Sequence, residues 1–258
     1  MPARLNSAAT LARFALVEAR RSGLPWLAVA ALAAAIALAG FLSQLALTES
    51  LSLQVSVVAA LLRAGAVFVI ASHVAASTLR EANDKGIELA LSMPLSRSAY
   101  YLGRLAGFAA LGAALAAVFS LPLLLWCAPY AVLCWGVSLA AETVLMAAAA
   151  LFFSSALAQL APALAASVGL YLLGRAIGAI QAIASGPLAA DSAAQQAVRR
   201  SLDAVALLVP RLDLATRSEW LLYAAPGAGD WLRGVAPLVV YAALLAAAGL
   251  FDFHRRNL

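Results

Sequence analysis

Long and nearly uninterrupted apolar runs dominate this sequence and leave few folds open to it. Each run holds about 20 residues, which at about 1.5 Å per residue is enough to cross a hydrocarbon core about 30 Å thick. Hydrophobic residues make up 65% of the 258 residues and charged residues only 11%, too little polar surface for a water-soluble domain of this length. We therefore expect an all-α membrane protein with six transmembrane helices, over residues 25–47, 55–79, 102–126, 130–153, 161–183 and 232–252.

Two segments outside these spans have helical patterns of their own. In residues 1–23, basic residues such as Arg20 and Arg21 alternate with apolar ones at helical spacing, which is typical of an amphipathic helix in the membrane interface. Residues 184–230 contain apolar runs too short to cross a bilayer. We expect short outer helices there that dip into the membrane, with Ser201 or Ser218 as a capping residue.

The positive charges predict how the helices are oriented. The short connections near 48–54 and 127–130 hold no lysine or arginine, whereas the N-terminal segment, residues 80–98 and the C-terminal tail hold many. Because short cytoplasmic loops are enriched in these residues, both termini and residues 80–98 are expected in the cytoplasm. The alanine- and arginine-rich composition suggests a high-GC bacterial gene. We therefore expect a multi-pass protein of the bacterial cytoplasmic (inner) membrane.

Motifs for catalysis are missing from the sequence. A Walker phosphate-binding loop needs a lysine between glycine and serine or threonine, but Lys85 stands between Asp84 and Gly86. The two histidines, His73 and His254, form no HExxH pair and predict no metal site. We therefore expect no enzyme and no bound cofactor, and any ATP hydrolysis must come from another subunit. The arginines are spread along loops, which favours membrane orientation over nucleic-acid binding.

The segment REANDKGIELALSMPLSR, residues 80–97, is a polar island between the second and third spans. Gly86 is expected to break the helix that continues from the second span, and Ile87 begins a short apolar stretch that we expect to be helical. Pro94 then forces a turn before the third span. From the residues alone, a solvated loop that only fixes the topology remains the plain alternative.

The same segment resembles the coupling-helix region of ABC-2-type transporter permeases, which commonly read E-x-x-x-G-T-x-E-x-L-L-x-x-P-x-S-R. Isoleucine stands where the threonine after the glycine is usual. The stretches ETVLMAAAALFFSS, LLVPRLDL and FHRRNL resemble further segments of that family. The residues that fall on the coupling pattern are Glu81, Lys85, Gly86, Glu88, Leu91, Pro94, Ser96, Arg97, Gly103 and Arg104.

This resemblance implies that residues 1–258 form one ABC-2-type transmembrane domain, with residues 80–98 as its coupling region. A short helix would lie in a groove of a separate ABC ATP-binding subunit, where ATP and Mg are held. Glu81, Lys85 and Glu88 would be charged contacts, and Ile87 and Leu91 apolar anchors. The implied function is ATP-driven export by two permease copies, or by this chain and a paralogue. A subgroup associated with multi-copper enzyme maturation has this length and a similarly small outer segment.

Four ionisable residues lie inside the expected spans, namely Arg63, His73, Glu142 and Arg175. An unpaired charge costs several kcal/mol in a bilayer, so each is expected to face protein or a wet cavity. Arg63, Glu142 and Arg175 lie at similar depths, which permits an ion pair. They could lock helices together, or they could line a substrate or proton path.

Two other functions therefore remain open. One is an ion-coupled secondary transporter that uses these charges, and the other is a non-transporting membrane anchor for an ATPase. Small residues in Gly174-x-x-x-Gly178 permit close helix contact, within the chain or between two copies.

Overall fold

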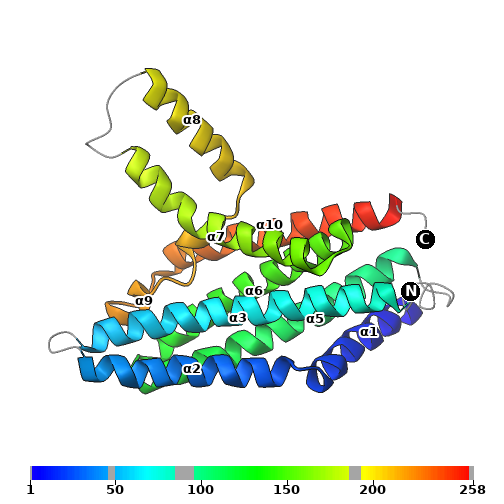
Figure 1. Ribbon diagram of the computed structural model, residues 1–258, viewed down its shortest axis with the longest axis horizontal. Helices are drawn as coiled ribbons and strands as arrows, with labels where there is room; N and C mark the ends of the chain where they lie inside the picture. The colour runs from blue at the N-terminus through cyan, green and yellow to red at the C-terminus, as the bar shows by residue number, and fades with distance from the viewer. Residues whose placement is uncertain (1, 46–49, 85–95, 186–192, 256–258) are drawn as a thin grey trace.

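The computed structural model describes residues 2–45, 50–84, 96–185 and 193–255, and every regular element within them is a helix (Figure 1). The model contains six helices that are long and apolar enough to cross a membrane, so the prediction of a polytopic helical membrane protein is confirmed. Their bounds are α2 (Leu24–Leu45), α3 (Ser50–Asn83), α5 (Arg97–Ser120), α6 (Pro129–Leu157), α7 (Leu160–Ala184) and α10 (Ala228–Arg255).

Five shorter or flanking elements complete the described fold. The segment between α7 and α10 contains short helices, as expected, but the capping role predicted for Ser201 is wrong. Ser201 lies inside α8, where its hydroxyl donates to the Ala197 carbonyl, 2.9 Å away. These elements are α1 (Pro2–Arg21), η1 (Leu121–Leu125), α8 (Ala193–Leu208), η2 (Leu212–Leu214) and α9 (Glu219–Leu222).

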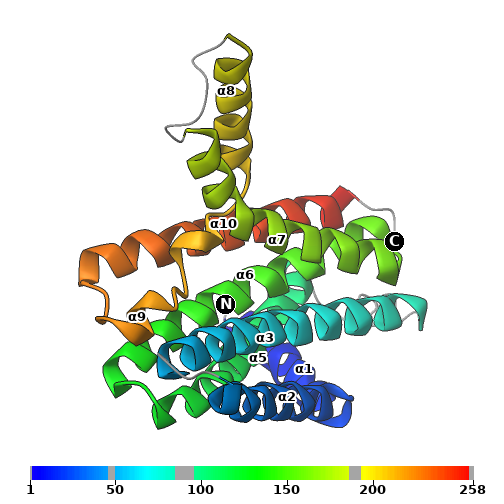
Figure 2. The same cartoon turned by 60° about the vertical axis from the view of Figure 1, so that its left-hand side comes forward.

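Helix α6 forms the centre of the bundle and packs against α3, α5, α7 and α10 (Figures 1 and 2). Its middle is built from small side chains, and the run Ala147–Ala150 is fully or almost fully buried. On α5, Gly112 lies so close to α6 that an added Cβ would stand 3.2 Å from the Thr143 hydroxyl oxygen. Small residues thus let these two helices approach closely enough to gain van der Waals contact inside a bilayer.

The connection between α6 and α7 is short and tight. Ala158 adopts a left-handed conformation, with φ 51° and ψ 18°, and its N–H bonds to the Ser154 carbonyl. Gln159 is extended, and α7 begins at the next residue. This pattern is a common way to end one helix and start an antiparallel neighbour.

Helix α1 lies along α5 and turns its small residues inward. Ala15 and Ala19 are buried, whereas Phe14 and Val17 are 59% and 52% exposed. The beginning of α1, the end of α3, the beginning of α5 and the end of α10 all lie at one end of the bundle (Figure 1). The predicted coupling segment joins α3 to α5 at this end, but its central residues, 85–95, lie outside the described residues.

The first part of α7 packs in the bundle, and its C-terminal part forms with α8 a hairpin that projects sideways (Figures 1 and 2). Polar side chains hold the hairpin together: Gln195 and Arg199 of α8 donate to the Ala184 carbonyl at the end of α7. Gln181 of α7 donates to Asp203 of α8 at 2.9 Å. The polar face of α8 therefore contacts α7, and exposed apolar residues such as Leu207 and Leu208 are left on the outside.

Candidate functional site

A buried arginine joins three helices at the end of the bundle where the chain termini lie. Arg104 of α5 is only 3% exposed and forms ion pairs with Glu18 of α1 at 3.1 Å and Glu81 of α3 at 2.7 Å. The Ser77 hydroxyl of α3 accepts from Arg104 at 2.9 Å and donates to Glu18 at 2.6 Å. We call these four residues the Arg104 cluster.

Two carboxylates surround the charge of Arg104, and one aromatic ring also contacts it. The Arg104 guanidinium lies 4.7 Å from the centre of the Phe108 ring, where a cation–π interaction is favourable. Burial of Glu18 disfavours its charged form, but the Ser77 hydroxyl and Arg104 outweigh this effect, so the pKa of Glu18 is lowered from its ordinary 4.5. His73 lies nearby, with its Nδ1 atom 3.4 Å from the Ser22 hydroxyl and its ring edge-on to Phe108.

The structure describes only the two flanks of the predicted coupling segment. Glu81, at the first flank, is bound within the chain to Arg104. Arg97, at the second, donates to the His254 carbonyl in the last turn of α10, 3.2 Å away. The segment is thus tied to both the N-terminal and the C-terminal helices. The other predicted contact residues lie outside the described residues, and these are Lys85, Gly86, Ile87, Glu88, Leu91 and Pro94.

Three of the four predicted intramembrane residues meet at a second buried site. Glu142 of α6 is fully buried, and one of its oxygens accepts from the Thr216 hydroxyl at 2.5 Å. Arg175 of α7 donates to the same hydroxyl at 3.0 Å, and Arg63 of α3 donates to the Thr216 carbonyl at 2.8 Å. Within the described residues, Thr216 therefore bridges these side chains in place of the direct ion pair that similar depth had suggested.

Both arginines of this second site donate to the backbone of an irregular segment, residues 209–218. Arg175 also donates to the carbonyls of Leu212 and Ala215. Thr216 has a φ of 45°, a left-handed conformation that is uncommon for threonine, and its hydrogen bonds hold it there. We call residues 209–218 the inner loop.

Glycines on α7 make room for the inner loop. A Cβ added at Gly174 would lie 2.7 Å from the Pro210 carbonyl oxygen, and one at Gly178 would overlap the Asp213 carboxylate. The Gly174-x-x-x-Gly178 pattern was read as a site of close helix contact, but the structure seats this loop against it. Glycine spacing alone does not distinguish a neighbouring helix from a neighbouring loop.

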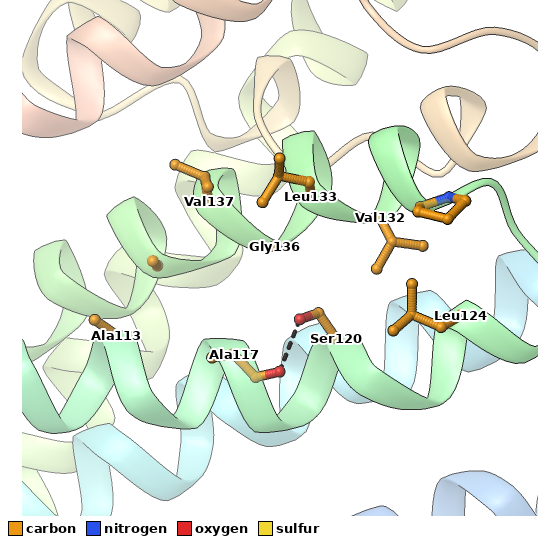
Figure 3. Close-up of a pocket in the computed structure, with 10 residues that line it drawn as sticks. Ala113, Ala117, Ser120, Leu124, Val132, Leu133, Gly136 and Val137 are labelled. Carbon is orange, nitrogen blue, oxygen red and sulfur yellow. Dashed lines mark hydrogen bonds between the residues drawn. The ribbon is translucent and has the colours of Figure 1, made fainter.

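An apolar cavity of about 320 Å³ lies between α5 and α6, near their junction (Figure 3). Its only hydroxyl belongs to Ser120, which already donates to the Ala117 carbonyl at 2.8 Å. The cavity thus offers shape but no polar group to orient a ligand. It is lined by Ala113, Ala117, Ser120, Leu124, Pro129, Val132, Leu133, Gly136, Val137 and Ala140.

Sequence reasoning missed the partners that organise both sites. Glu18 is the first acidic residue of the chain and stands among basic residues of α1, a signal that could have drawn attention to it. Thr216 carries no such signal, because its role depends on a backbone conformation. The two cysteines, Cys127 and Cys134, are free and half-buried, and burial raises the pKa of the Cys127 thiol. A raised pKa keeps a thiol protonated and unreactive.

Comparison of the sequence with protein-family models and with curated proteins gives no match. The resemblance to ABC-2-type permeases therefore rests on the sequence motifs alone.

Proposed function

We propose that this chain is the membrane-spanning permease subunit of an ATP-driven ABC-2-type transporter and acts in export. Six apolar helices, an N-terminal helix beside them and a polar segment between the second and third spans agree with that family's order of elements. A separate ABC ATP-binding subunit would hold ATP and Mg, and a second permease copy or a paralogue would complete the transporter.

The observation that carries the proposal is the anchoring of both flanks of the polar segment. Glu81 is bound through Arg104 to Glu18 of α1, and Arg97 is bound to the last turn of α10. A force applied to residues 85–95 would therefore reach α1, α3, α5 and α10 together. A loop that served only to fix topology would need no such connections to both ends of the chain.

The same scheme gives a role to α1 and an orientation to the bundle. The termini and the polar segment would lie in the cytoplasm of a bacterium, where ATP is available, and the protein would span the inner membrane. Phe14 and Val17 point away from α5 and would enter the interface, while Arg20 and Arg21 reach lipid headgroups.

An ion-coupled transporter is a second candidate, favoured by one observation. Glu142 is fully buried, and its second oxygen, Oε1, has no hydrogen-bond partner within the described structure. A buried carboxyl group with an unbonded oxygen is a reasonable proton carrier. This function would require transport by the chain alone.

Crosslinking and transport assays separate the two candidates. In membranes that contain the chain and its ATP-binding subunit, Ile87→Cys should crosslink to that subunit, and Glu88→Arg should reduce co-purification at least severalfold. Glu219→Arg makes the same charge change at a 72% exposed position on α9 and should leave assembly intact. Proton-driven uptake by the purified chain in liposomes, abolished by Glu142→Gln, would reject the ABC proposal.

A further inference from the structure

A polar cavity of about 430 Å³ lies over the inner loop and has no role in the coupling scheme. Its size is within the range of cavities that bind small molecules. Arginines from α3, α7 and the inner loop reach it from three directions. The lining residues are Arg63, Arg175, Asp213, Ala215, Arg217, Ser218 and Glu219.

The position of this cavity requires water or protein on its open side. Arg63 and Arg175 lie roughly 18 Å and 14 Å from the nearer ends of their candidate spans, at about 1.5 Å per residue. Both donate to the inner loop, so Ala215 and Thr216 lie within one arginine side chain of these positions. Irregular backbone at membrane depth is tolerated only where protein buries it or where it lines a water-filled cavity.

Two exposed charges beside the loop show whether this surface faces lipid or water. Arg217 is 41% exposed and Glu219 is 72% exposed, and the nearest approach between them is 3.9 Å. Glu219 begins α9, whose Leu221 and Leu222 share a cavity with Leu51 and Ser52 near the beginning of α3. Charged and exposed side chains would be strongly unfavourable in hydrocarbon. The face that carries them is therefore turned toward water, either in the chain itself or in a space between two copies.

The charge balance of the cavity favours an anion. Three arginines and two acidic residues, Asp213 and Glu219, line the cavity. Asp213 is paired with Arg211 through two hydrogen bonds of 2.9 Å, and Glu219 approaches Arg217 at 3.9 Å. Arg63 and Arg175 donate mainly to neutral groups, namely backbone carbonyls and the Thr216 hydroxyl. Glu142 is therefore the main negative charge that opposes these two arginines.

We propose that this arginine-lined cavity is a water-filled site that binds an anionic group, a carboxylate or a phosphate. Arg217 meets the group at the mouth, while Arg63 and Arg175 attract it from the wall. That the group belongs to an exported compound rests on the function proposed above, but the binding itself does not. The anion could be a free solute or the headgroup of a lipid, since both present the same oxygens.

Charge-selective labelling of a single cysteine tests this site in the purified chain, without any ATP-binding subunit. Ser218→Cys, with Cys127 and Cys134 changed to alanine, puts a thiol in the cavity wall and keeps every arginine. In phosphatidylcholine nanodiscs, an anionic methanethiosulfonate should react at least about tenfold faster than a cationic one, because a cavity of one charge concentrates counter-ions. Arg217→Gln should reduce that ratio severalfold, and Arg233→Gln should not. Arg233 is an exposed arginine outside the cavity and is a matched control.

Competition identifies the source of the anion. Slower labelling in inorganic phosphate supports a free anion, and slower labelling only in phosphatidylglycerol nanodiscs supports a headgroup. The proposal is overturned if neither slows the reaction, if the cationic reagent reacts as fast as the anionic one, or if neither reagent reacts. Because no ATP-binding subunit is present, these results do not depend on whether the ABC assignment is right.

Discussion

The two buried charge clusters use the same kinds of residue for opposite purposes. In the Arg104 cluster, one arginine meets two carboxylates, and every partner is a side chain of a regular helix. At the second site, Thr216 stands between the arginines and one carboxylate, and most of the arginines' hydrogen bonds go to the backbone of the inner loop. The first cluster joins helices to one another, whereas the second holds the backbone of the inner loop against α3 and α7.

The two clusters also differ in their net charge. The Arg104 cluster holds one positive and two negative side chains, and Arg104 is bound within the chain on both sides, which suits a rigid connection. The second site has more positive than negative charge and faces a cavity, which suits recognition of an anion. The sign of the surplus charge, negative in the Arg104 cluster and positive at the second site, distinguishes the two clusters more clearly than burial does.

Removal of the shared arginine should give the largest effect. Arg104→Gln leaves two neighbouring carboxylates without a counter-charge, and breaking a buried ion pair in this way costs about 3–5 kcal/mol. We expect a clear fall in the midpoint of thermal unfolding in detergent, followed by tryptophan fluorescence. Arg233→Gln, at an 82% exposed position, should leave the midpoint unchanged.

A double substitution shows whether the loss of stability comes from unpaired charge. Adding Glu81→Gln to Arg104→Gln removes one of the unpaired carboxylates and should recover part of the stability. If Arg104→Gln unfolds the chain no more readily than Arg233→Gln, the Arg104 cluster does not connect the helices.

A smaller loss of stability is expected when a side chain is added on α7 where the inner loop packs. Gly174→Ala brings a methyl group to 2.7 Å from the Pro210 carbonyl, and overpacking of this kind costs about 1–3 kcal/mol. Gly169→Ala is the matched control, because nothing lies within 4 Å of a Cβ at that position on the same helix. It should leave stability unchanged or raise it slightly. Equal effects of the two substitutions in thermal unfolding would mean that the loop is not seated against α7.

The smallest effect concerns the acid sensitivity of the Arg104 cluster. The pKa of Glu18 is lower in the folded chain than its ordinary 4.5, so the folded state is stabilised above that pH. This contribution is lost as the pH falls through the folded pKa. Unfolding midpoints measured from about pH 6 down to pH 3 should therefore fall less steeply for Glu18→Gln than for the unchanged chain. Parallel curves would show that Glu18 is not ionised in the cluster.

The sequence predicted the spans well because their signal is local. A run of about 20 apolar residues indicates a membrane helix whatever it packs against. All six predicted spans correspond to helices of the structure. The meeting of Arg63, Glu142 and Arg175 was partly predictable, since each carries a cost that needs a partner. Their bridge through Thr216 was not, because it depends on a left-handed backbone in a loop far along the chain.

The Arg104 cluster also could not be predicted from the sequence. Arg104 was noticed as part of a family pattern near the polar segment, yet its burial between Glu18 and Glu81 depends on how α1 packs along α5. Three helices distant in sequence must come together before that ion pair exists. Hydropathy and motif spacing contain no information on such packing.

We propose that the polar segment and the arginine-lined cavity lie on opposite sides of the membrane. Labelling of one cysteine in each of them, from either side of the membrane, tests this arrangement. In a background with Cys127 and Cys134 changed to alanine, Glu88→Cys and Ser218→Cys would each be exposed to an impermeant maleimide in sealed spheroplasts and in inverted vesicles. We predict that Ser218→Cys reacts only in spheroplasts and Glu88→Cys only in inverted vesicles. Reaction of Glu88→Cys in spheroplasts would put the polar segment outside the cell and contradict its coupling to an ATP-binding subunit.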